Sequence, residues 1–126
     1  MNNGYSLAKV WNIIKTHFPE YGILTMEWGF VITNDRLNSI GNGVQFYILV
    51  YENSPIMLIT DNGLYKEANK SDIKVNDADK IDLANYGVSI RNDALTSIVS
   101  RDDENIIVNG FRKYSKLMNK LFIVKE

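Results

Sequence analysis

The sequence predicts a single α+β domain, and three observations lead to this prediction. Apolar residues recur at three- and four-residue spacing near both ends of the chain, which is typical of amphipathic helices. Between them, runs rich in β-branched and aromatic residues alternate with turn-forming Asn, Asp and Gly, which favours strands. Because a parallel return needs about a dozen residues of crossover, the short links here predict antiparallel neighbours. The 126 residues contain no repeat and no linker, so one domain over 1–126 is expected.

The first predicted element is a helix. Its apolar stripe consists of Leu7, Val10, Trp11, Ile14 and Phe18. Ser6 is a suitable N-cap residue, and Pro19 prevents the helix from continuing past Phe18. We therefore expect an N-terminal helix whose apolar face packs on the core.

A three-stranded antiparallel meander is predicted next, from Trp28 to Thr60. Its strands correspond to the runs WGFVIT, GVQFYILVYE and PIMLIT. Turn residues separate these runs, among them Gly41-Asn42-Gly43 and Asn53-Ser54-Pro55. In Val44–Tyr51 both alternating faces are apolar, so we expect this strand to be central and covered on both sides.

The region after the meander predicts short elements. Leu64–Lys80 is polar and weakly periodic, which indicates a short helix and a loop. Asp79–Tyr86 predicts a further short helix that ends at Gly87 in the left-handed conformation. Val88–Arg91 and Leu95–Val99 flank an Asn-Asp pair and predict a small hairpin.

The last predicted element is a long C-terminal amphipathic helix. Ser100 and Asp103 form a capping-box pattern ahead of it, and acidic residues occupy its first turn. The apolar face consists of Ile107, Phe111, Tyr114, Leu117, Met118, Leu121 and Phe122, and the opposite face carries Arg112, Lys113, Lys116 and Lys120. Gly110 interrupts this helix, and we expect another element to pack closely there.

Three stretches of the chain resemble a family of bacterial and phage domains of unknown function. They are LITDNG (Leu58–Gly63), NYGVSIRNDAL (Asn85–Leu95) and NIIVNGFRKYSKLMNKLFI (Asn105–Ile123). The family typically has a second Asp where this chain has Asn62, so a function that needs paired carboxylates at that turn is not implied here. The resemblance implies the predicted architecture and a bacterial or phage origin, and it implies no activity.

Composition excludes several classes of protein. The net charge of −1 differs from the strongly basic charge of many nucleic-acid-binding domains. Because the chain has no cysteine, it cannot form disulfides or thiolate metal sites. Because His17 is its one histidine, it cannot form a two-histidine metal site. No run approaches the roughly 20 apolar residues of a membrane helix. The N-terminus has no signal-peptide pattern, so we expect a cytoplasmic protein with no membrane partner.

Amino-acid composition supplies a hint about origin. The chain contains 15 Asn and 15 Ile, and its 14 basic residues are mostly lysine. Because A/T-rich codons encode these amino acids, the sequence indicates a low-GC bacterium, a phage or another mobile element.

Catalytic candidates are few. Asp61 follows a strand, where a carboxylate can bind a metal, but an Asp at a turn more commonly accepts backbone hydrogen bonds. A two-metal site would need further carboxylates, which Glu27 and Asp35 could supply. His17 lies at a helix C-terminus, where the helix dipole accounts for it without catalysis. No catalytic residue, metal site or cofactor is therefore predicted.

The candidate interaction surface combines basic and aromatic residues. It comprises Arg112, Lys113, Lys116, Lys120, Tyr51, Tyr65 and Asp61. The basic helix face could contact phosphates or an acidic protein surface, although a solvated helix face has the same pattern. Tyr21, Tyr51 and Tyr65 lie near predicted loops, and tyrosine is enriched at protein interfaces.

The sequence thus favours a non-enzymatic protein-binding module. Our hypothesis is that it acts by occluding a partner's surface, for example as an inhibitor of a host defence complex. Two alternatives stay open: a nucleic-acid-binding module that uses the basic helix face, and a metal-dependent nuclease or hydrolase that uses Asp61. The sequence does not determine the oligomeric state.

Overall fold

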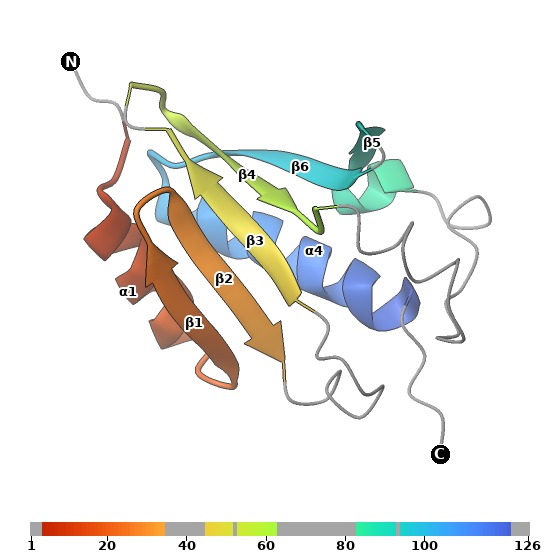
Figure 1. Ribbon diagram of the computed structural model, residues 1–126, viewed down its shortest axis with the longest axis horizontal. Coiled ribbons are helices and arrows are strands. Elements are labelled where there is room, and N and C mark those ends of the chain that lie inside the picture. The colour runs from red at the N-terminus through yellow and green to blue at the C-terminus, as the bar shows by residue number, and fades with distance from the viewer. Residues whose placement is uncertain (1–3, 35–44, 52, 63–82, 93, 122–126) are drawn as a thin grey trace.

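The computed structural model describes residues 4–34, 45–51, 53–62, 83–92 and 94–121. The elements in chain order are α1 (Leu7–His17), β1 (Tyr21–Met26), β2 (Gly29–Asn34), β3 (Gln45–Val50), β4 (Ile56–Thr60), the 3₁₀ helix η2 (Leu83–Tyr86), β5 (Ser89–Arg91), β6 (Ala94–Ser100) and α4 (Glu104–Leu121). The described strands form one antiparallel sheet in the order β1-β2-β3-β4-β6-β5. Figure 1 shows α1 and α4 behind this sheet, so the predicted α+β class is confirmed.

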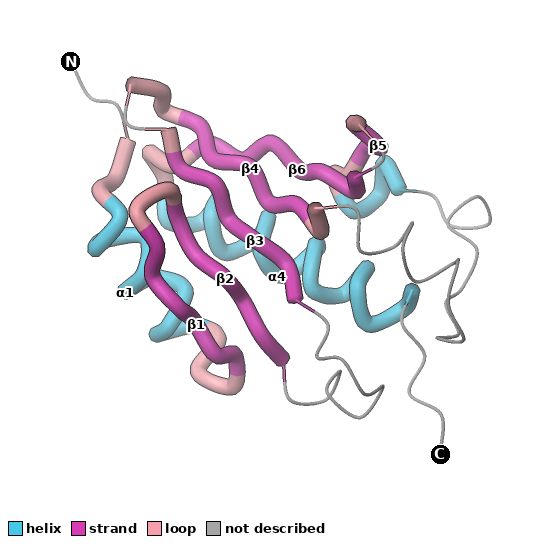
Figure 2. The backbone as a smooth tube through the Cα atoms, viewed as in Figure 1, coloured by secondary structure: helices cyan, strands magenta, loops and turns pink. Residues whose placement is uncertain are grey.

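The sheet and the two helices form two layers (Figure 2), and the core residues lie between them. We call the sheet face toward α1 and α4 the inner face. Its buried apolar residues include Phe30, Ile32, Phe46, Ile48, Met57, Ile59, Leu95 and Val99. The helices add Val10, Ile13, Ile14, Ile107, Phe111, Tyr114, Leu117 and Met118. Packed aromatic rings join the layers: the Phe111 ring centroid lies 4.5 Å from that of Phe18 in a tilted arrangement and 5.2 Å from that of Tyr21 edge to face.

The N-terminal helix has the predicted boundaries. The Ser6 hydroxyl accepts the Lys9 N–H at 3.2 Å, which satisfies one of the unpaired donors of the first turn. Helix α1 ends at His17, and the Phe18 N–H still donates to the Ile14 carbonyl. Pro19 follows directly, where its ring cannot continue the helix.

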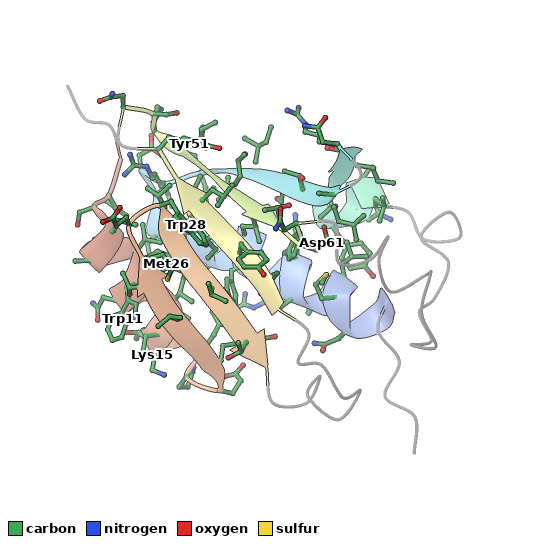
Figure 3. All side chains as sticks on the ribbon, viewed as in Figure 1. Trp11, Lys15, Met26, Trp28, Tyr51 and Asp61 are labelled. Carbon is green, nitrogen blue, oxygen red and sulfur yellow. The ribbon has the colours of Figure 1, made fainter. Side chains whose placement is uncertain are left out.

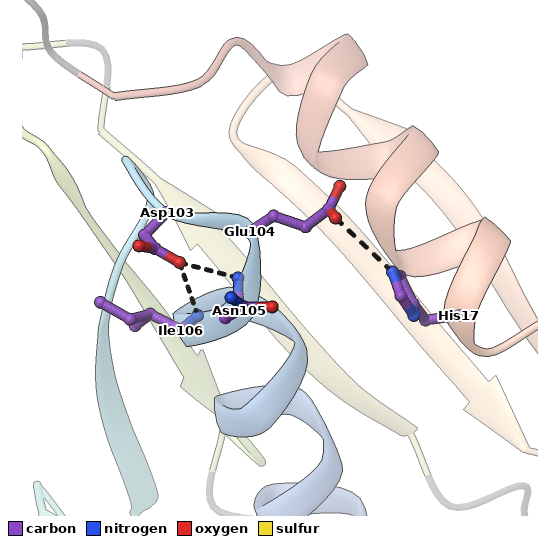
Figure 4. A network of polar contacts seen from close by, with 5 residues as sticks. All are labelled: His17, Asp103, Glu104, Asn105 and Ile106. Atoms are coloured by element: carbon purple, nitrogen blue, oxygen red, sulfur yellow. Dashed lines mark hydrogen bonds and ion pairs between the residues drawn. The ribbon is translucent and has the colours of Figure 1, made fainter.

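The C-terminal helix begins later than the capping-box pattern predicts. Ser100 is the last residue of β6, so it cannot be the cap. The Asp103 carboxylate instead accepts the N–H groups of Asn105 at 2.8 Å and Ile106 at 3.3 Å (Figure 4). The next residue, Glu104, lies 3.9 Å from the His17 imidazole and links the start of α4 to the end of α1.

The sheet is larger than the predicted meander, because the prediction missed β1. Residues Tyr21–Met26 pair with β2 through a two-residue turn, Glu27-Trp28. Such turns normally carry Gly, Asn or Asp, and this one carries none, so its sequence gives no turn signal. Strand β2 accordingly begins at Gly29, and Trp28 lies in the turn.

The predicted small hairpin exists, but it belongs to the same sheet. Strand β6 pairs with β5 on one side and with β4 on the other. The predicted left-handed residue at the end of the preceding short helix is confirmed, since Gly87 has φ +68° after η2. The helix predicted within Leu64–Lys80 lies outside the described residues.

The close approach expected at Gly110 is also confirmed. A Cβ on this residue would lie 2.8 Å from Val99 Cγ2 on the inner face of β6. Helix α4 therefore packs directly on the sheet at this point, and the missing side chain makes that contact possible.

Candidate functional site

Asp61 is a buried structural residue, which corrects its place in the predicted interaction surface. Its side chain is 1% exposed, at the end of β4. The carboxylate accepts the Leu95 N–H at 2.9 Å, so it pairs with the neighbouring strand and holds the start of β6. The turn itself uses Thr60, whose hydroxyl accepts the Asn62 N–H at 3.1 Å. Asn62 has φ +52°, a left-handed conformation that Asn tolerates.

The carboxylates proposed for a two-metal site do not come together. Glu27 lies in the β1–β2 turn, beyond the end of the sheet where Gly29, Leu49 and Leu58 pair. Asp61 follows Thr60, which is at the opposite end of the same strands. Asp35 lies outside the described residues. No group of three metal-ligating side chains occurs in the described part of the chain.

Tyr114 completes the buried polar cluster around Leu95. Its hydroxyl donates to the Leu95 carbonyl at 2.7 Å, and the Asp61 N–H donates to the same oxygen at 3.3 Å. Burial raises the pKa of Tyr114 well above its ordinary value, and the nearby Asp61 charge raises it further. The cluster therefore favours a neutral tyrosine, which is suited to a structural role.

The basic face of α4 is present. Arg112, Lys113 and Lys116 are exposed, and the Arg112 guanidinium lies 5.7 Å from the Phe18 ring centroid. The Lys120 side chain and the whole of Tyr65 lie outside what the structure describes. The described part of the basic face, from Arg112 to Lys116, is thus exposed.

The two described tyrosines that were predicted to lie near loops, Tyr51 and Tyr21, differ in exposure. Tyr51, directly after β3, is 49% exposed and stays a candidate contact residue (Figure 3). Tyr21 is buried, because its ring packs against Phe18 and Phe111. Tyr21 is therefore a core residue and no interface candidate.

The sequence prediction missed an exposed apolar surface, which is the sheet face opposite the helices. We call this the outer face. Its large apolar side chains are exposed or half-buried: Leu24, Met26, Trp28, Val31, Tyr47, Leu49, Leu58 and Ile98. Among the elements that the structure describes, both long helices lie on the inner side, and none covers this face (Figure 1). The expectation that residues 44–51 are covered on both sides is therefore not met in the described structure.

Strand pairing joins these side chains into a continuous surface. Leu24 lies opposite Val31, and Val31 opposite Tyr47. In a second row Leu49 lies opposite Leu58, and Leu58 opposite Ile98. Side chains directly opposite each other in antiparallel strands are in contact range. The outer face thus carries apolar contacts from β1 across to β6.

Trp28 extends the outer face at one end of the sheet. Its ring centroid lies 6.1 Å from that of Tyr47, and its carbonyl accepts the Val50 N–H at 2.9 Å. The next residue must be glycine, because a Cβ on Gly29 would lie 1.8 Å from the Ile48 carbonyl oxygen. This close backbone approach fixes Trp28 beside β3.

Arg101 is a buried cation that the sequence analysis did not identify. Its guanidinium donates to the carbonyls of Ser54 at 3.0 Å, Tyr51 at 2.7 Å and Tyr5. These contacts connect the segment before α1 with the β3–β4 loop. Arg101 therefore positions the backbone of the exposed Tyr51.

In comparisons with known proteins, no family model, curated protein or solved structure matches the chain. In the described residues, no helix is both long enough and apolar enough to cross a membrane.

Proposed function

We propose that this chain is a non-enzymatic protein-binding module that binds its partner through the outer face. The observation that supports this proposal is the continuous apolar surface over five strands, which no described element covers. Large contiguous apolar patches are uncommon on monomeric proteins and mark interaction sites. The partner's contact surface would accordingly be apolar.

The composition of the outer face also favours a protein partner. Its described strand positions in β1, β2, β3, β4 and β6 carry no charged side chain. Interface centres are depleted of charge and enriched in aromatic residues and methionine. Trp28, Tyr47 and Met26 fit this composition, whereas a phosphate backbone would need cations that this face does not supply.

The proposed biological setting is a cytoplasmic protein of a low-GC bacterium, phage or mobile element. The abundance of Asn, Ile and Lys and the resemblance to bacterial and phage domains support it. In that setting we propose that the module inhibits by occlusion: it covers a surface that the partner, such as a host defence complex, needs for its own assembly or substrate. This mechanism requires no catalytic residue in the module.

The test compares two matched variants of the tagged protein in a pull-down from low-GC bacterial lysate treated with nuclease. Ile98→Lys charges the outer face, and Ile106→Lys charges an equally exposed apolar residue on α4; the two side chains are 47% and 45% exposed. We expect a stoichiometric partner with the wild type and Ile106→Lys, and its loss with Ile98→Lys. Equal capture by both variants contradicts the proposal.

A second candidate function is nucleic-acid binding through α4. The exposure of Arg112, Lys113 and Lys116 on one helix supports it. It predicts nucleic-acid binding that weakens steeply with salt and disappears in the Lys113→Glu, Lys116→Glu double variant. Unchanged binding in the double variant contradicts it, and recovery of the partner only without nuclease would favour it over the outer face.

A further inference from the structure

The two edges of the described sheet differ in a way that points to self-association. Strand β5 has three residues and ends in Arg91. Strand β1 has six residues, YGILTM, without charge or proline, and it pairs with β2 on one side only. Short or charged edges resist pairing with another chain, whereas a long apolar edge acts as a template for it.

The backbone contacts of Tyr21 show which residues of β1 face the open edge. Its N–H donates to the Phe18 carbonyl at 3.2 Å, and its own carbonyl accepts from Lys15 Nζ at 3.5 Å. Neither group therefore bonds to β2. Because the direction of backbone groups alternates along a strand, Ile23 and Thr25 face the same edge as Tyr21.

We propose that β1 pairs antiparallel with β1 of a second copy of this chain, with Leu24 at the two-fold axis. In this register Ile23 and Thr25 of one copy exchange backbone hydrogen bonds with Thr25 and Ile23 of the other. A shift by one residue pair in the direction of Tyr21 would require its N–H, which is already bonded to Phe18. The backbone contacts of a single copy therefore disfavour the register that is shifted toward Tyr21.

The side chains of β1 are complementary in the same register. Leu24, which is 61% exposed, meets Leu24 of the second copy across the axis on the outer face. The exposed Met26 lies opposite Gly22. Each of these pairs covers apolar surface that a single copy leaves in water.

Charges at the ends of the paired strands are also complementary. Tyr21 of one copy lies opposite Glu27 of the other, and Lys15 is bound to the Tyr21 carbonyl. The pairing thus places a lysine near a glutamate on each side of the axis. Figure 3 shows Trp11 and Lys15 on α1 beside the β1 margin, and Trp11 is 37% exposed there. This inference does not depend on the proposed function, since it uses the edge of the sheet and leaves most of the outer face accessible.

Sedimentation velocity of the full chain over a concentration series tests the proposal. We expect a reversible dimer, whose dissociation constant rises at least about tenfold in Leu24→Lys because two like charges then meet at the axis. Ile98→Lys and Ile90→Lys, also at exposed apolar positions, are expected to leave dimerisation unchanged. A monomer at every concentration, or a dimer insensitive to Leu24→Lys, overturns the proposal.

Crosslinking tests the register. The chain has no cysteine, so each single-cysteine variant reports on one position. Directly opposed residues of a non-hydrogen-bonded antiparallel pair have Cα atoms about 4.5 Å apart, which a disulfide can span. Leu24→Cys is expected to form a disulfide-linked dimer with oxidised glutathione, and Ile98→Cys is not. Equal crosslinking at both positions overturns the register.

A charge exchange provides an independent control. Lys15→Glu and Glu27→Lys are each expected to weaken the dimer, and the double variant is expected to restore it. Failure of the double variant to recover, with folding confirmed by circular dichroism, contradicts antiparallel pairing. Binding of the lysate partner is measured in parallel, so loss of the dimer and loss of partner binding are distinguishable.

Discussion

The hydroxyl of Tyr114 in α4 donates a 2.7 Å hydrogen bond to the carbonyl of Leu95 in β6. The same backbone unit donates its N–H to the Asp61 carboxylate. One residue of β6 is thus held from two sides, by the last helix and by the end of β4. Both contacts are buried, so each contributes to stability without competition from water.

Tyr114→Phe tests the first of these contacts. We expect the free energy of unfolding to fall by about 1 kcal/mol, because the Leu95 carbonyl keeps only the Asp61 N–H as a partner. Urea denaturation measures the change, and the exposed Tyr51→Phe serves as the control. Equal stability of the two variants would show that the hydroxyl makes no net contribution.

The raised pKa of Tyr114 predicts a stability loss at alkaline pH. Above about pH 10 the unfolded chain releases this proton while the folded chain retains it. The contribution of Tyr114 is therefore complete below that pH and declines as pH rises toward the folded-state pKa. Unfolding free energies between pH 9 and 11 are expected to fall more steeply in the wild type than in Tyr114→Phe. Parallel pH profiles would contradict the assignment.

Substitutions at Asp61 separate a structural role from a catalytic one. Asp61→Ala leaves the Leu95 N–H without its acceptor, and we expect a loss of about 2 kcal/mol of stability. Asp61→Asn retains an acceptor oxygen and is expected to lose less. Thermal unfolding measures which of the two variants is the less stable. A fully stable Asp61→Ala protein that lost a metal-dependent activity would instead revive the enzyme hypothesis.

Gly110 and Val99 are expected to be energetically coupled. Alanine favours a helix over glycine by about 1 kcal/mol, but its Cβ would meet Val99 here. Gly110→Ala is therefore expected to give no gain in the wild type and a gain of about 1 kcal/mol in the Val99→Ala background. A double-mutant cycle by chemical denaturation measures this coupling, and strict additivity would argue against the close contact.

Arg101→Lys tests the buried guanidinium. A lysine cannot reproduce the planar set of donors that serves the carbonyls of Ser54, Tyr51 and Tyr5. We expect a loss of about 3 kcal/mol in the free energy of unfolding, comparable to breaking a buried charged contact. Arg91→Lys, at an exposed position of β5, is the matched control and is expected to be neutral.

Local signals predicted the helices and most strands. Apolar spacing and Pro19 defined α1, and the cap and stripe pattern located α4 to within a few residues. Strand β1 was missed because the Glu27-Trp28 turn lacks turn-forming residues. The pairing of β6 with β4 was missed because these strands are far apart in the chain, and no local pattern encodes such a contact.

The candidate site was harder to predict than the fold. The sequence indicated that Asp61 accepts a backbone hydrogen bond, but its partner Leu95 lies 34 residues away. The two apolar faces of residues 44–51 were evident, yet which face the helices cover depends on tertiary packing. The basic face of α4 was visible from the sequence because helical periodicity alone places its residues.

The position of α4 on the inner face has a consequence for biosynthesis. Strands β1 to β4 leave the ribosome before α4, which supplies Phe111, Tyr114 and Leu117 to their core side. Until α4 is synthesised, both faces of the nascent sheet expose apolar side chains. Transiently exposed apolar surface of this kind is prone to aggregation, and we expect the addition of α4 to cover the inner side of the sheet.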